Sequence, residues 1–263
     1  MNDGYELTRQ IISILPSLDE SVVSQFNTLE HLNEVMKLNL PTLLVDNEKF
    51  NLENKLTKKQ LYDTVNDCLI SDFNLILKER PTSKYGNLDG KDLSKVLLTN
   101  GNIIISTKKV FPDTTEDINR LIIESWDSSI YTELENDNAV KRMGFIFEIP
   151  DTMTKFINYN TIQLESGKPL ETFEGFYVPE GDIYSIVSIM SGLSYPEKRI
   201  NKIKAVLEES KQSVNKVKTV NIFDSANDCS WFGDMRQESS SEDLFGFGSD
   251  DGDLDLDNLF NNY

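Results

Sequence analysis

The sequence predicts an α+β protein with a predominantly helical body, one small antiparallel sheet and a disordered acidic C-terminal tail. Three observations lead to this fold class. Apolar residues recur at helical spacing over much of residues 18–134. Short β-branched and aromatic runs gather within residues 142–178. Residues 238–263 hold eight acids and no Lys, Arg or His, and are too rich in Ser, Gly and Asp to pack a core.

The sequence of the first half of the chain predicts mainly helices and few strands. Residues 5–15 and 18–38 predict a helical hairpin, because both have apolar residues at helical spacing and Pro16 separates them. A short strand is expected at 43–45. Thr57 is expected to cap a long helix that ends near residue 79. A short helix at 92–98 and a buried strand at 103–105 follow.

The second half contains the best strand of the chain. A capping-box pair, Thr114 and Asp117, predicts a helix start. The apolar run 143–149 predicts a strand, and 162–164 and 173–178 are two further strand candidates, so 142–178 would form the small antiparallel sheet. Residues 183–190 are apolar and fit either a helix or a strand; we favour a helix. A basic helix at 195–218 is the last ordered element that we expect.

These elements predict three regions along the chain. Residues 1–136 form a mainly helical N-terminal region, 137–220 the small sheet plus the basic C-terminal helix, and 221–263 a flexible acidic tail.

Composition limits the class of protein. The net charge is −18, and the tail supplies eight of these negative charges, so the body is acidic as well, whereas a general nucleic-acid binder is more often basic. Two cysteines indicate neither a disulfide framework nor a zinc site.

The chain shows no signal peptide and no apolar run long enough for a bilayer, so we expect no membrane contact and a cytoplasmic protein, in the host cytoplasm for a phage protein. The abundance of Asn, Ile, Lys and Asp is typical of an AT-rich genome, such as that of a phage, a virus or a low-GC bacterium.

The sequence contains little that is typical of an active site. It has no G-x-x-x-x-G-K-S/T phosphate loop. The single histidine, His31, is interpreted as a surface residue, because no partner residues for a metal or catalytic role can be named. Cys68 lies on an apolar helical face and is interpreted as a core residue. We therefore expect no catalytic residue, no metal site and no cofactor, and an enzyme with a carboxylate-bound magnesium ion is the third alternative.

The tail is the most distinctive part of the sequence. A solubilising end is its simplest interpretation. Acid beside Leu-Phe pairs is also what a docking peptide needs, since charge steers the peptide to a groove and the aromatic ring anchors it. The expected docking residues are Leu244, Phe245, Phe247, Leu256, Leu259 and Phe260. In this respect the tail resembles those of single-stranded-DNA-binding proteins and the terminal peptides with which phage replication and late-transcription proteins dock on sliding clamps.

The basic helix offers two further expectations. Its cations form an anion-binding or tail-binding face: Lys198, Arg199, Lys202, Lys204 and Lys211. Its apolar residues follow a three-four spacing that allows a homo-oligomer: Ile200, Ile203, Leu207, Val214 and Val217.

Two functional hypotheses follow. The leading one is a non-enzymatic interaction or assembly protein of a phage or virus, an adaptor whose acidic Leu-Phe tail docks on a larger complex. The alternative is a nucleic-acid-binding replication or transcription accessory protein whose acidic tail masks the basic helix.

Overall fold

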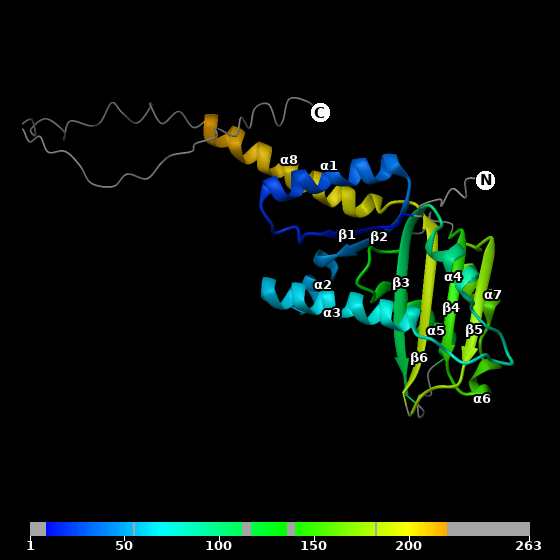
Figure 1. Cartoon of the computed structure of the whole chain (residues 1–263). Coiled ribbons are helices and arrows are strands. Elements are labelled where there is room, and N and C mark those ends of the chain that lie inside the picture. Colours follow the sequence, from blue (N-terminus) through cyan, green and yellow to red (C-terminus); the bar gives the residue numbers. More distant parts are fainter. Residues whose placement is uncertain (1–8, 55, 112–116, 136–139, 182, 220–263) are drawn as a thin grey trace, which may run out of the picture. The chain divides into compact units, whose positions relative to one another are not determined.

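The computed structural model describes residues 9–54, 56–111, 117–135, 140–181 and 183–219, and the side chains of 51–54 and 214–219 lie outside the description (Figure 1). The tail residues predicted to dock on a partner lie outside it too. In chain order, the elements are β1 (Ile11–Leu15), α1 (Val22–Leu38), β2 (Pro41–Asp46), α2 (Asn47–Asn54), α3 (Lys58–Leu77), α4 (Gly90–Leu97), β3 (Gly101–Val110), α5 (Ile118–Asp127), β4 (Arg142–Glu148), α6 (Asp151–Thr154), α7 (Tyr159–Glu165), β5 (Glu171–Tyr177), β6 (Tyr184–Leu193) and α8 (Glu197–Thr219).

One mixed sheet organises these elements. Its six strands lie in the order β1-β2-β3-β6-β4-β5. The β1–β2, β2–β3 and β4–β5 pairs are parallel, whereas β6 is antiparallel to both β3 and β4. The predicted α+β class with a small antiparallel sheet at 142–178 is therefore wrong, and the fold is α/β. The reason is the crossover: α6 and α7 connect β4 to β5, and such a connection returns the chain in the same direction.

Two apolar clusters cover the β1–β2 part of the sheet. On one face, Leu15 and Leu44 pack with buried residues of α1 and α8. On the other, Leu43 and Val45 join the large core, to which α3 contributes Leu61. In Figure 1, α1 and α8 accordingly lie on one side of β1 and β2, and α3 on the other. Helices therefore pack on both faces of β1 and β2 and hold in place the ends of these strands, where the candidate site lies.

Three segments form a different secondary structure from the one predicted. Residues 11–15, expected in a helix, form β1, so the helical hairpin is wrong. Residues 162–164, expected as a strand, belong to α7. Residues 183–190 were expected in a helix, but all of them except the first lie in β6 and form most of that strand. β6 lies between β3 and β4 and is buried on both faces, and a strand of that kind shows no alternation of apolar and polar residues.

Other elements were predicted correctly because their local signals are strong. Thr57 caps α3 with a capping box in which Gln60 completes the exchange of hydrogen bonds. The strands at 43–45, 103–105 and 143–149 correspond to β2, β3 and β4. Asp117 is the N-cap of α5, whereas Thr114 lies outside the described residues. The basic helix corresponds to α8.

The six strands come from both sides of residue 137, the predicted border between the first two regions, and a single sheet joins them. The described residues up to position 217 form one compact unit. Within the described ranges, no helix combines the length and the apolar character that crossing a membrane would need.

Glu148 at the end of β4 holds the segment that follows α3 against the sheet. Its carboxylate accepts hydrogen bonds from Arg80 Nε at 2.9 Å, Lys78 Nζ at 3.1 Å and Ser185 Oγ at 2.9 Å. Burial raises the pKa of the Glu148 carboxyl, but the hydrogen bonds from Ser185 and Lys78 and the charge of Arg80 outweigh burial, so the pKa lies below its ordinary value.

We expect Glu148→Gln to lower the free energy of unfolding by about 1.5–3 kcal/mol at pH 7, because it removes the charge that three donors share. A lowered pKa stabilises the fold above the ordinary value of 4.5, and this contribution disappears as pH falls through the lowered pKa. Urea unfolding should therefore show a difference between wild type and variant at pH 7 that shrinks towards pH 3. Glu171→Gln, at an exposed ion pair with Arg142, is the matched control and should change little. A pH-independent difference would contradict this account.

Candidate functional site

The candidate site lies where β1 and β2 end. Leu15 and Asp46 are partners in the parallel register, so Pro16–Ser17 and Asn47, which follow them, leave the sheet at the same edge. Parallel strands in α/β folds present their carboxyl ends to ligands, because loops and helix N-termini gather there. A ligand site is therefore expected at this edge.

Buried polar atoms without a partner gather at this edge. Within the described part of the chain, seven buried side-chain atoms have no hydrogen-bond partner, and five of them lie here: Ser17 Oγ, Gln25 Oε1, Asn47 Nδ2, Asn47 Oδ1 and Arg199 Nη1. Asn47 is only 1% exposed and Gln25 is fully buried. Because most buried polar groups are hydrogen-bonded, a concentration of unpaired ones indicates that a bound molecule or ordered water completes them.

Hydrogen bonds connect these residues into one network. Gln25 Nε2 donates to the Ser17 carbonyl at 2.7 Å, and Arg199 donates through its second Nη to the Pro16 carbonyl. Arg199 Nε donates to Asp46 Oδ1 at 3.0 Å, and both side chains are buried. The same carboxylate oxygen accepts the backbone N–H of Glu48.

Burial dominates the electrostatics of Asp46. Removal from water raises the pKa of its carboxyl above the ordinary value, although the Arg199 charge and hydrogen bond oppose this shift. Arg199 therefore balances a buried negative charge at the carboxyl end of β2, and its Nη1 has no hydrogen-bond partner.

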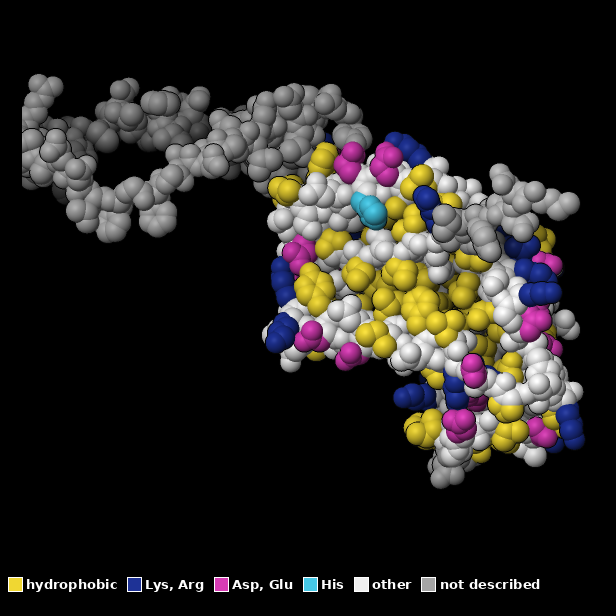
Figure 2. Space-filling view, viewed as in Figure 1, with side chains coloured by type: hydrophobic (Ala, Val, Ile, Leu, Met, Phe, Trp, Pro, Cys, Tyr) yellow, Lys and Arg dark blue, Asp and Glu magenta, His cyan; other side chains and the backbone are white. Residues whose placement is uncertain are grey.

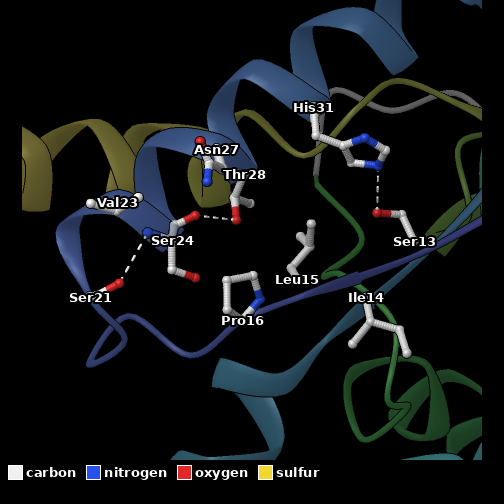
Figure 3. A pocket seen from close by; sticks show the side chains of 10 residues that line it. All are labelled: Ser13, Ile14, Leu15, Pro16, Ser21, Val23, Ser24, Asn27, Thr28 and His31. Carbon is white, nitrogen blue, oxygen red and sulfur yellow. Dashed lines mark hydrogen bonds between the residues drawn. The ribbon is translucent and has the colours of Figure 1, made fainter. Parts of the chain in front are cut away.

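A groove of about 550 Å³ adjoins this edge, between β1 and α1 (Figure 3). Its lining runs from Ser13 and Ile14 on β1, through Pro16, to Val23, Asn27 and His31 on α1. His31 is exposed, as expected, and its Nε2 lies 3.0 Å from Ser13 Oγ.

The residues of α8 that were predicted to bind anions are partly exposed and partly buried. Lys198, Lys202 and Lys204 are exposed, and Lys211 pairs with Glu208 at 3.0 Å. Arg199 instead points inward to Asp46, so it does not belong to an exposed face. A basic face made by the exposed lysines stays a prediction.

The predicted oligomer seam is largely an internal contact. Ile200, Ile203 and Leu207 are buried against Leu15, Leu44 and α1. The side chains of Val214 and Val217 lie outside the described residues.

Sequence reasoning missed Ser17, Gln25 and Asn47. One signal was present: Asp46-Asn47 directly follows the predicted strand 43–45, and polar residues at the carboxyl end of a buried parallel strand mark a ligand edge. These polar residues indicate a ligand edge only once β1 and β2 are known to be parallel neighbours.

Comparisons with solved structures show that the fold resembles that of the proteins TubZ and CetZ. TubZ of Clostridium botulinum phage c-st is 20% identical, with a TM-score of 0.60, and the match covers 78% of this chain and 61% of that one. TubZ of Bacillus thuringiensis serovar israelensis, in GDP-form protofilaments, is 17% identical, with a TM-score of 0.66 and coverage of 80% and 59%. CetZ2 of Haloferax volcanii, a GTPγS-bound protofilament, is 18% identical, with a TM-score of 0.59 and coverage of 82% and 64%.

The chain thus spans about 60% of the length of these neighbours. No protein-family model and no curated protein matches the sequence.

These neighbours correct the predicted function. The adaptor without enzymatic activity is contradicted, because solved neighbours are described as GDP-form protofilaments, a GDP-bound monomer and a GTPγS-bound protofilament. Neither the docking of the tail on a protein partner nor the alternative role in nucleic-acid binding finds support among them. The phage origin agrees with one neighbour, and the filaments of several are compatible with a homo-oligomer.

Proposed function

We propose that this chain is part of a tubulin-like GTPase that assembles into filaments in the cytoplasm, in that of the host if the protein is from a phage. The observation that carries this proposal is the fold, which matches GDP- and GTPγS-form protofilaments over about four fifths of the chain. Because the chain spans only about 60% of those proteins, we assign to it the part of the nucleotide site that its own residues can form.

The network at the ends of β1 and β2 supports recognition of a guanine base. The edge of guanine carries an acceptor, O6, beside two donors, N1–H and N2–H. The Asn47 side chain offers a donor and an acceptor, both buried and unpaired, and Arg199 offers a further N–H. Since the sequence has no phosphate loop, we assign the base side of the site to this chain and the phosphate side to another segment.

The test is a comparison of nucleotides. Purified chain, labelled for NMR, is titrated with GTP and with ATP, and signals of Asn47 and Ser17 are followed. Base contacts without phosphate contacts give weak binding, with a Kd on the order of 1 mM for GTP and weaker for ATP. Sedimentation in the presence of GTPγS then reports polymer formation.

Asn47→Leu should weaken GTP binding roughly tenfold, because two hydrogen bonds to the base are lost while the side-chain volume is kept. The matched control is Asn27→Leu, an exposed residue in the wall of the adjoining groove, which should bind GTP as wild type does. If GTP and ATP shift the same signals equally, or neither shifts them, this function is refuted.

A further inference from the structure

The unpaired polar atoms of the candidate site are closed off from solvent. All five of them lie in the interior, and Asn47, which carries two, is 1% exposed. A ligand that is to form hydrogen bonds with Asn47 therefore cannot reach it in this conformation. A segment next to Asn47 must move before a ligand can enter, and such segments are turns or loops that weak contacts hold in place.

The turn of residues 17–20, which connects β1 to α1, lies beside Asn47. Because β1 and β2 are parallel neighbours in register, Ser17 and Asn47 leave the sheet at the same edge. Glu48, the residue after Asn47, accepts the backbone N–H of Leu18 through its carboxylate at 2.7 Å. The turn therefore runs past the start of α2, where the unpaired amide lies.

Glu20 connects the far end of this turn to α3. Its Oε2 forms an ion pair with Lys58 Nζ at 3.0 Å, and its Oε1 accepts a hydrogen bond from the Tyr62 hydroxyl at 3.2 Å. Lys58 and Tyr62 lie in the first two turns of α3. The hydrogen bond from Lys58 is the main cause that lowers the pKa of the Glu20 carboxyl, so the carboxylate is ionised at pH 7. We call these two contacts the Glu20 latch.

The latch is exposed to water, whereas the other end of the turn is held in the interior. The side chain of Lys58 is 63% exposed and that of Glu20 is 19% exposed. Figure 2 shows acidic and basic side chains at the end of the molecule where α3 begins, and hydrophobic ones over the space between α1 and α3. At the other end of the turn, the buried Gln25 Nε2 donates to the Ser17 carbonyl at 2.7 Å. Since exposed ion pairs stabilise a structure only slightly, the Glu20 end is the one that can release.

We propose that the turn of residues 17–20 is a gate over Asn47, that the Glu20 latch keeps this gate closed, and that release of the latch admits the ligand. The identity of that ligand, a guanine base, rests on the proposed function. The need for an opening rests only on the burial of the unpaired atoms. A gate that is closed most of the time lowers the apparent affinity in proportion to its open fraction, so loss of the latch should strengthen binding.

The first measurement needs no ligand. Exchange of the Asn47 side-chain amide protons with water is followed by NMR in the full chain, because a buried group exchanges only while the structure is open. Glu20→Ala should speed this exchange roughly three- to tenfold, since both contacts of the latch are lost. The buried side-chain amide of Asn119, which donates to Asp117 and to the Phe156 carbonyl, is the internal reference and should exchange at an unchanged rate.

Further variants separate the latch from other effects. Lys58→Met combined with Tyr62→Phe removes the same contacts from the α3 side and should give the same acceleration. Glu34→Ala, which removes an exposed ion pair within α1, is the matched control and should leave the exchange of Asn47 as in wild type. If neither latch variant changes the exchange of Asn47, or if Asn47 and Asn119 are accelerated alike, the gate is overturned.

The second measurement is the affinity for GTP. Titration followed on the NMR signals of Asn47 should give an apparent Kd that is roughly three- to tenfold lower in Glu20→Ala than in wild type. The variant that removes the latch from the α3 side should show the same gain. An apparent Kd that is unchanged or higher in both latch variants would overturn the proposal, because opening would then not limit binding.

The two proposals fail separately. Faster exchange of Asn47 in the latch variants, without binding of GTP to wild type or to any variant, refutes the nucleotide function and leaves the gate intact. Binding of GTP that wild type and latch variants share equally, with unchanged exchange of Asn47, refutes the gate alone.

Discussion

Leu207→Asp is expected to abolish cooperative folding at pH 7. Leu207 is 6% exposed and packs in the cluster that joins α8 to α1 and to the face of β1 and β2. Removing a buried leucine side chain costs about 2–5 kcal/mol, and a buried carboxylate without a partner costs several more. The sum is comparable to the whole stability of a typical domain, about 5–15 kcal/mol.

The measurement is urea unfolding followed by circular dichroism, together with mass determination by light scattering. Leu207→Ala should remain folded and lose about 2–5 kcal/mol. Ala205→Asp, on the exposed side of the same helix, should behave like wild type. If Leu207→Asp is instead a folded species of lower mass than wild type, the apolar residues of α8 form an interface between copies and the internal packing described here is wrong.

Local signals predicted the elements well where neighbours in sequence decide the outcome. The capping box of Thr57 and Gln60 forms within four residues, and β4 carries enough β-branched and aromatic residues to be recognised alone. β6 was missed because its apolar run reflects burial between β3 and β4, which are distant in sequence. The five residues of β1 were missed because Ile11, Ile14 and Leu15 fit helical spacing as well as a half-buried strand.

The site could not be predicted for a related reason. Asn47 becomes informative only when its two polar atoms prove to be buried and unpaired, and that depends on packing against residues from several elements. Arg199 lies 153 residues from its partner Asp46 and looked like one of several surface cations. The acidic tail is evident from the composition alone. The mixed sheet, on which the similarity to TubZ and CetZ depends, is not evident, because its strands are distant in the sequence.

The buried ion pair provides the last prediction. Arg199→Met keeps most of the apolar stem and removes the charge, so the Asp46 carboxyl, whose side chain is 9% exposed, is left without a counter-charge. Breaking a buried pair in this way costs about 3–5 kcal/mol, and we expect that loss in the free energy of unfolding at pH 7. Lys202→Met, at an exposed position on the same helix, is the control and should change the stability little.

The pH dependence of this loss has a definite sign. Burial already raises the pKa of the Asp46 carboxyl above 3.8, and without Arg199 it should rise further. A carboxyl with a raised pKa favours the folded state below its ordinary pKa, and this contribution is lost as pH rises through the raised value. The deficit of Arg199→Met should therefore shrink as pH falls from 7 to 5. Adding Asp46→Asn should recover part of the lost stability, because it removes the unpaired charge. A deficit that is equal at both pH values, or a double variant that shows the sum of both losses, would mean that the pair is not what holds α8 to the end of β2.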